Sequence, residues 1–167
     1  MKLKNDIYVY EWTNAYENNC NSYFIGGNVQ ALIDPGLTGY VPDLLNRMSA
    51  DGIKKEDIRY VINTHSHPDH VGLAGWIVDR FNCPLQMSQV EYLQSVYHQN
   101  RGTEERKMAQ RLFFRRHGMD ENLTDKLLGR GQDYLKRVSI LPPSYRRISH
   151  GEEICDLAAS GRDGCCV

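Results

Sequence analysis

Residues 64–75, Thr-His-Ser-His-Pro-Asp-His-Val-Gly-Leu-Ala-Gly, follow closely on the apolar run Tyr60-Val61-Ile62. Within six of these positions lie four side chains that bind divalent metal ions: His65, His67, Asp69 and His70. Alternate residues of an extended segment point the same way, so the first two histidines can present their imidazoles to one ion. Pro68 favours extended backbone before it and fixes its own φ, so we expect a strand to end and a helix to begin there.

Asp69 and His70 are then expected in the first turn of that helix, where unpaired N–H groups and the helix dipole favour a charged carboxylate. Imidazole and carboxylate groups without a thiolate suit zinc, and also manganese or iron. The alternative is a polar surface loop that holds three histidines by chance. The metal site is favoured because a strand precedes the cluster and a helix follows it.

The His-x-His-x-Asp-His pattern after a strand resembles the metal motif of the metallo-β-lactamase-fold hydrolases. The segments 21–25 and 31–36 are similar to that superfamily's paired N-terminal strands and its Asp-x-Gly turn, so the resemblance covers most of residues 5–90. It implies an α/β fold, the αββα sandwich, with the first half present, the second half largely absent and a helical insertion at residues 88–140. We expect one incomplete domain over residues 1–167.

The resemblance also implies ligands that lie further along the chain. His65 and His67 would share one metal with a third histidine from a Gly-His segment, and Asp69 and His70 would hold a second metal with another histidine and a bridging aspartate. The chain has no Gly-His pair, and after the motif it has only His98, His117 and His150. We therefore expect a chain truncated near the start of the second half, with a shortened or frame-altered end. Metal binding would be weakened and one apolar sheet face left open.

Hydrophobic periodicity predicts alternating strands and helices, which is typical of α/β layering. The expected strands are 7–12, 22–25, 29–33, 59–63, 83–87, 145–148 and 152–155. The expected helices are 41–50, ended by Gly52, then an apolar helical face from Val71 to Phe81, and two or three helices within 88–140. Asp34 ends the third of these strands, and two roles stay open for it: holding the histidine loop by hydrogen bonds, or bonding its own backbone in a turn.

Composition excludes several classes of protein. Charge is balanced, with 20 basic against 21 acidic residues, which argues against a nucleic-acid partner. The N-terminus lacks the apolar core of a signal peptide, and no apolar run approaches the ~18 residues of a membrane helix, so we expect a cytoplasmic protein without a membrane partner. Five cysteines without a C-x-x-C pair argue against a disulfide framework.

Between positions 101 and 147, twelve basic residues face six acidic ones. The basic residues are Arg101, Arg106, Lys107, Arg111, Arg115, Arg116, Lys126, Arg130, Lys136, Arg137, Arg146 and Arg147. A solvated helix face is the commoner explanation. The alternative is a basic lid that favours a small anionic substrate, such as a phosphate, a carboxylate or a coenzyme thioester.

Three functions follow from these observations. The first is a metal-dependent hydrolase in which one or two zinc ions (or manganese or iron) activate a hydroxide that attacks an ester or thioester, while Asp69 ligates and orients that nucleophile. The motif with its helical insertion looks most like the glyoxalase-II-related thioesterases. The second is a phosphodiesterase or nuclease of the same superfamily, whose motif generally has Gly in place of Pro68. The third is a non-catalytic, truncated paralogue.

Overall fold

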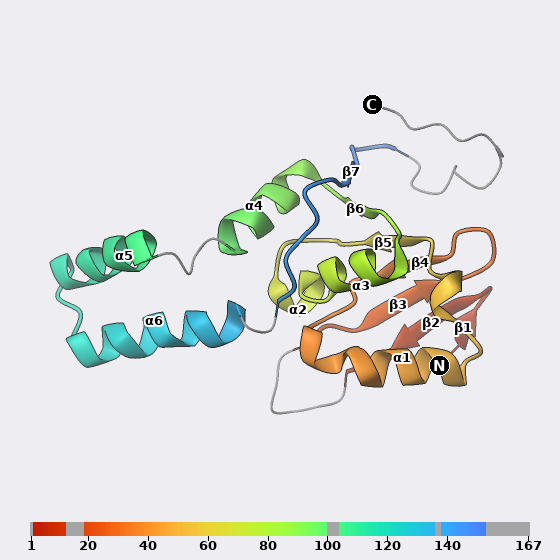
Figure 1. The fold of residues 1–167 in the computed structure, drawn as a ribbon, viewed down its shortest axis with the longest axis horizontal. Coiled ribbons are helices and arrows are strands. Elements are labelled where there is room, and N and C mark those ends of the chain that lie inside the picture. The colour runs from red at the N-terminus through yellow and green to blue at the C-terminus, as the bar shows by residue number, and fades with distance from the viewer. Residues whose placement is uncertain (1, 13–18, 100–103, 136–137, 153–167) are drawn as a thin grey trace.

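The computed structural model describes residues 2–12, 19–99, 104–135 and 138–152 (Figure 1). Within these residues the strands form one seven-stranded sheet in the order of the sequence. The strands are β1 (Lys2–Lys4), β2 (Ile7–Tyr10), β3 (Ser22–Ile25), β4 (Ala31–Ile33), β5 (Tyr60–Ile62), β6 (Leu85–Met87) and β7 (Arg146–Arg147). The strands β1 to β4 pair antiparallel, and β4 to β7 pair parallel. The sheet is therefore mixed, as in an α/β protein.

Six of the seven predicted strands and the predicted helices are present among the described residues, several of them with changed boundaries. The α-helices are α1 (Val41–Ala50), α2 (Pro68–Val71), α3 (Ala74–Phe81), α4 (Gln89–Gln99), α5 (Glu104–Arg116) and α6 (Glu121–Leu135), with short 3-10 helices η1 (Thr38–Tyr40) and η2 (Lys55–Asp57). The strand expected from residue 29 begins only at Ala31, because Gln30 has a left-handed φ of 53°. The strand expected from Cys83 begins at Leu85, after a left-handed Asn82 that ends α3. Part of the strand expected at 152–155 lies outside the described residues.

Strand register divides the sheet into two faces. Tyr8, Phe24, Leu32, Val61 and Leu85 pair across five strands and pack into one core. That core also contains Leu44 and Met48 of α1 and Ile77 of α3, the two helices that lie in front of the sheet in Figure 1. Burial of these apolar side chains is the main force that holds helices and sheet together.

The opposite face of the sheet is also largely apolar. On it Val9, Tyr23, Ile33 and Ile62 are paired in turn, and the row continues to Gln86. Tyr23 keeps 37% of its surface exposed, and so does its neighbour Ile7. Val9, Ile62 and Gln86 of the same face are buried, so the open apolar face that the sequence predicted is not found along this row.

The helix α1 ends where the sequence predicted. Gly52 has a φ of 79°, which glycine adopts without strain, and its N–H donates to the carbonyl of Ser49. The next N–H, that of Ile53, donates to the carbonyl of Met48 at 2.9 Å. The chain thus reverses and returns to enter β5.

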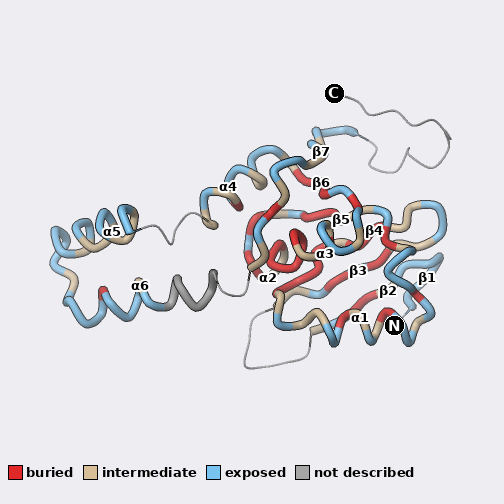
Figure 2. Tube along the Cα trace, in the orientation of Figure 1, coloured by how far each residue is buried: buried red, intermediate tan, exposed pale blue. Residues whose placement is uncertain are grey.

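Three helices lie between β6 and β7 in the part of the chain that the structure describes, where the sequence predicted two or three. Figure 1 shows α5 and α6 side by side, extending away from the sheet, and Figure 2 shows that much of α5 and of the coloured part of α6 is exposed. Arg111 of α5 forms ion pairs with Glu121 and Asp125 of α6, and the guanidinium of Arg106 lies over the Tyr97 ring. These contacts favour a solvated helix face for this part of the basic segment. Every helix among the described residues is too short or too polar to cross a bilayer.

The chain crosses α3 very closely as it returns from α6 to β7. A Cβ atom built on Gly75 would lie 1.9 Å from the carbonyl oxygen of Ile140, so backbone must move to admit any side chain. We expect overpacking in Gly75→Ala to reduce the free energy of unfolding by about 1–3 kcal/mol. The thermal midpoint should fall as a result. Circular dichroism melting measures this change.

The matched control is Gly129→Ala in α6, where an added Cβ meets nothing within 4 Å. Because alanine is the better helix former, we expect this control to hold or slightly raise the midpoint. Equal midpoints for the two variants would contradict the close crossing at Gly75.

Candidate metal centre

The candidate site lies at the carboxyl ends of β4 and β5, where neighbouring parallel strands release their chains at the same sheet edge. Asp34 follows β4, and the motif residues follow β5. His67 has extended backbone before α2, with Pro68 as the first helical residue, which confirms the predicted turn from strand to helix. The helical run expected from residue 71 is interrupted at Gly72 and Leu73, so α2 is a single turn that carries Asp69 and His70.

Asp34 is held in place by its backbone. Its φ is 47°, a left-handed conformation that aspartate tolerates better than most residues. Its N–H donates to the carbonyl of Ile62 at 3.0 Å, and its carbonyl accepts the Ser22 hydroxyl at 2.7 Å. The carboxylate is thereby turned from the end of β4 toward the motif.

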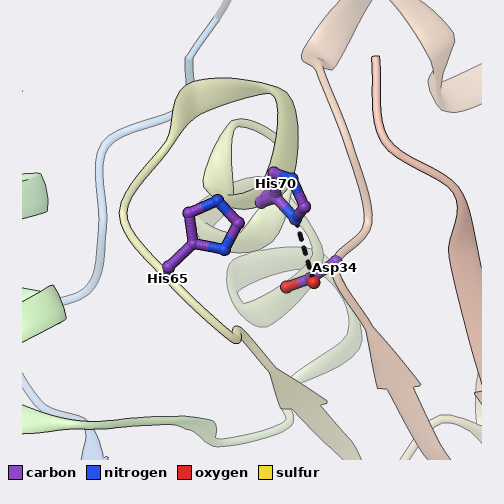
Figure 3. Close-up of side chains that lie close together, drawn as sticks. All are labelled: Asp34, His65 and His70. Atoms are coloured by element: carbon purple, nitrogen blue, oxygen red, sulfur yellow. Dashed lines mark hydrogen bonds and ion pairs between the residues drawn. The ribbon is translucent and has the colours of Figure 1, made fainter.

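The carboxylate of Asp34 accepts four hydrogen bonds. Its Oδ1 accepts the backbone N–H of Thr64 at 2.8 Å and the side-chain amide of Asn63 at 3.3 Å. Its Oδ2 accepts the Thr64 hydroxyl at 2.6 Å and pairs with Nδ1 of His70 at 3.0 Å (Figure 3). Of the two roles left open by the sequence, the structure supports the one in which Asp34 holds the histidine loop.

These bonds define which nitrogen of two imidazoles carries hydrogen. The hydroxyl hydrogen of Thr64 is donated to Asp34, so Thr64 Oγ1 accepts from Nδ1 of His65, 2.9 Å away. His70 likewise donates from Nδ1 to Asp34. On this assignment, made from the hydrogen-bond network, the Nε2 atoms of His65 and His70 both carry a lone pair, and that of His65 accepts a hydrogen bond from Nδ1 of His67. One carboxylate therefore orients two potential ligands.

The imidazoles and carboxylates of the motif lie close together. His65 Nε2 lies 3.0 Å from His67 Nδ1, and the rings of His65 and His70 have centroids 3.9 Å apart. His70 Nε2 lies 3.7 Å from Asp69 Oδ2. Asp34, His65 and His70 form a possible metal-binding triad, since one ligand atom from each lies within 4.8 Å of the others. Figure 3 shows these three side chains facing one another.

The cluster also favours the neutral form of His65. Burial lowers the pKa of this imidazole below its ordinary value, and the neighbouring His70 and His67 lower the pKa further. Because only a neutral imidazole can ligate, His65 remains able to bind a cation at a lower pH than an isolated histidine would.

Two other histidines considered from the sequence lie on exposed positions. His117 follows α5, where its Nδ1 lies 2.9 Å from the carbonyl of Phe113, and His150 lies in the turn after β7. His98 lies in the last turn of α4. None of the three belongs to the metal-binding triad found among the described residues.

The structure adds residues that the sequence did not single out. Asn63 and Thr64 join the motif to Asp34, and Asn63 also donates to the carbonyl of His70 at 3.0 Å. Glu91 and Gln94 of α4 accept hydrogen bonds from Ser66. One sequence feature could have indicated Glu91 and Gln94. They are polar residues three positions apart on a helix that begins just after a strand.

Comparisons with known proteins agree with this fold and site. The family model described as the metallo-beta-lactamase superfamily matches residues 15–154. A probable metallo-hydrolase of Methanocaldococcus jannaschii is 39% identical over 84 residues, which are 49% of this chain and 40% of that protein. The chain thus spans well under half the length of this curated relative.

Two solved structures share the fold. A metallo-beta-lactamase family protein of Thermus thermophilus has a TM-score of 0.66 at 22% identity, over 88% of this chain and 47% of its own. A beta-lactamase domain protein of Burkholderia ambifaria has a TM-score of 0.58 at 20% identity, over 91% of this chain and 44% of its own. The present chain corresponds to roughly the first half of their fold.

Proposed function

This chain belongs to the metallo-beta-lactamase superfamily, and from that premise we propose that it is a zinc-dependent hydrolase of ester or thioester bonds. The observation that carries the proposal is the convergence of His65 Nε2 and His67 Nδ1 at 3.0 Å, next to a His70 oriented by Asp34. The buried carboxylate of Asp34 orients the imidazole of His70 directly and that of His65 through Thr64. Carboxylates commonly orient histidines in this way where the histidines bind a metal ion.

The proposed ligands are His65 Nε2, His67 Nδ1, His70 Nε2 and the carboxylate of Asp69. Asp34 is proposed as a supporting residue instead of a ligand, because its two oxygens already accept four hydrogen bonds, the full capacity of a carboxylate. The donor set contains nitrogen and oxygen and no thiolate, which suits zinc and also admits manganese or iron.

A divalent cation held there would supply a nucleophilic water at neutral pH and polarise the scissile carbonyl. The chain's own residues provide the rest. Asp34, directly and through Thr64, keeps two imidazoles in the ligating tautomer. Asp69, whose side chain is 32% exposed, remains accessible to accept a hydrogen bond from the attacking water and so to orient it. A small anionic substrate is proposed from the excess of basic residues in the sequence alone, since Arg106 and Arg111 are engaged by other side chains of the helical segment.

A second candidate is a metal-binding chain without turnover. It is favoured by one observation, that among the described residues Asp34, His65 and His70 are the only group of three ligand-type side chains found close enough together to hold an ion. The two candidates share the metal centre and differ only in catalysis.

Elemental analysis combined with two assays separates these candidates. We expect the purified chain to contain zinc and to hydrolyse an acyl-glutathione thioester faster than bis(p-nitrophenyl) phosphate, with both zinc and hydrolysis lost after chelation. Zinc without hydrolysis would support the non-catalytic chain. Faster cleavage of the phosphodiester would favour a phosphodiesterase, and absence of any bound metal would overturn the proposed function.

A further inference from the structure

Ser66 separates the two histidines of the motif and is buried, with 5% of its surface exposed. The chain bends at residues 64–66, where Ser66 is buried while His65 is half-buried and His67 is exposed, so the serine side chain points into the protein and the two imidazoles do not. Both of its hydrogen-bond donors are taken by the same helix. Its N–H donates to Glu91 Oε2 at 2.7 Å, and its hydroxyl donates to Gln94 Oε1 at 3.0 Å.

The two acceptors are well placed to act together. Glu91 and Gln94 are three residues apart on α4, so their side chains share one face of the helix. The first is an ionised acceptor for a backbone N–H, which makes a short and comparatively strong hydrogen bond. The first contact holds the peptide plane between His65 and Ser66, and the second holds the Ser66 side chain between the two histidines.

The far end of α4 is joined to the other part of the motif. Gln99 donates to the carbonyl of Ser139 at 3.1 Å, and the N–H of Ser139 donates to the carbonyl of Gly72 at 2.6 Å. Gly72 directly follows α2, the helical turn that carries Asp69 and His70. The helix α4 is thus connected by hydrogen bonds to both sides of the candidate site.

We propose that Glu91 and Gln94 are positioning residues of the metal centre, which act through Ser66 to hold His65 and His67 in the arrangement that binds the ion. The metal ion in this inference rests on the proposed function, whereas the hydrogen bonds of Ser66 to Glu91 and Gln94 do not. It assigns the first of the three helices between β6 and β7 a role in metal binding, independent of any contact with substrate.

Zinc affinity tests the proposal, measured by competition with a chromophoric chelator. We expect Glu91→Ala to weaken zinc binding about 10- to 100-fold, the usual effect of losing a group that orients a ligand. Glu91→Gln retains an acceptor for the same N–H, so its affinity is expected within about fivefold of the wild type. The visible spectrum of the cobalt-substituted protein should change in Glu91→Ala and be restored in Glu91→Gln.

A double-mutant cycle tests the second contact. Ser66→Ala and Gln94→Ala each remove one partner of the same hydrogen bond. The zinc affinity of the double variant should therefore equal that of whichever single variant binds zinc less tightly. The control is Gln89→Ala, an exposed position on α4, which should bind zinc as the wild type does. Additive losses, or a Glu91→Ala variant that binds zinc within twofold of the wild type, would overturn the proposal.

Hydrogen exchange of the Ser66 amide in the metal-free protein separates this inference from the proposed function. We expect slow exchange in the wild type and in Glu91→Gln, and exchange at least tenfold faster in Glu91→Ala. If the wild type bound no zinc, the proposed function would fail, whereas the exchange rates would still decide whether α4 holds the loop. Equal exchange rates in all three proteins would refute that role.

Discussion

Replacement of His67 by alanine is expected to abolish hydrolysis and to weaken zinc binding by more than the roughly 100-fold that loss of an outer-shell partner produces. His67 lies opposite His65 with their nitrogens 3.0 Å apart, so its removal leaves a cation with one imidazole where the loop offers two. His67 is exposed, and exposed substitutions usually change stability by no more than about 0.5 kcal/mol. The loss should therefore appear in metal content and rate, with an unchanged melting temperature.

The matched control is His117→Ala, which removes an exposed histidine at the end of α5. It should leave zinc content and hydrolysis at wild-type levels. Turnover that persists in the His67→Ala protein would point to a contaminating hydrolase, and full zinc affinity in that variant would remove His67 from the proposed ligand set.

Asp34→Asn is the second substitution with a large expected effect, because it changes both stability and metal binding. Asparagine tolerates the left-handed backbone and has nearly the same shape, so the variant isolates the charge and the acceptors. In either orientation the new amide NH2 faces hydrogen-bond donors that the carboxylate accepted. Leaving buried donors without acceptors should destabilise the fold by about 2–5 kcal/mol.

The same substitution removes the acceptor that orients His65 and His70. Zinc affinity is expected to fall roughly 10- to 100-fold, and heteronuclear NMR of the imidazole nitrogens should show a mixture of tautomers at His70. Asp6→Asn is the control, since Asp6 is also an aspartate with a left-handed φ, 62°, but lies exposed near the N-terminus. A wild-type melting temperature for Asp34→Asn would contradict the hydrogen-bond network described above.

The two substitutions remove contacts that differ in sequence separation. His67 meets His65 two positions away, a contact within one short loop. Asp34 meets His70 across 36 positions, a contact that exists only because β4 and β5 lie side by side. The first should therefore survive local distortion of the fold, and the second should not.

The sequence by itself determined the α/β class and the family, and it predicted the candidate ligands, because these depend on local order. Spacing within residues 64–75, the proline before a helical turn and the apolar periodicity of segments such as 41–50 all act over a few positions. The predictions of metal identity, substrate and domain organisation rest on the resemblance and stay predictions.

Only the tertiary structure decided how the motif is supported. The sequence left two roles open for Asp34, because a carboxylate that ends a strand suits a turn as well as a distant histidine. It also gave no reason to connect Glu91 with Ser66, 25 positions earlier. Parallel strands bring together residues that are far apart in the chain, and the partners of a hydrogen bond at such an edge depend on strand order and register, which periodicity does not encode.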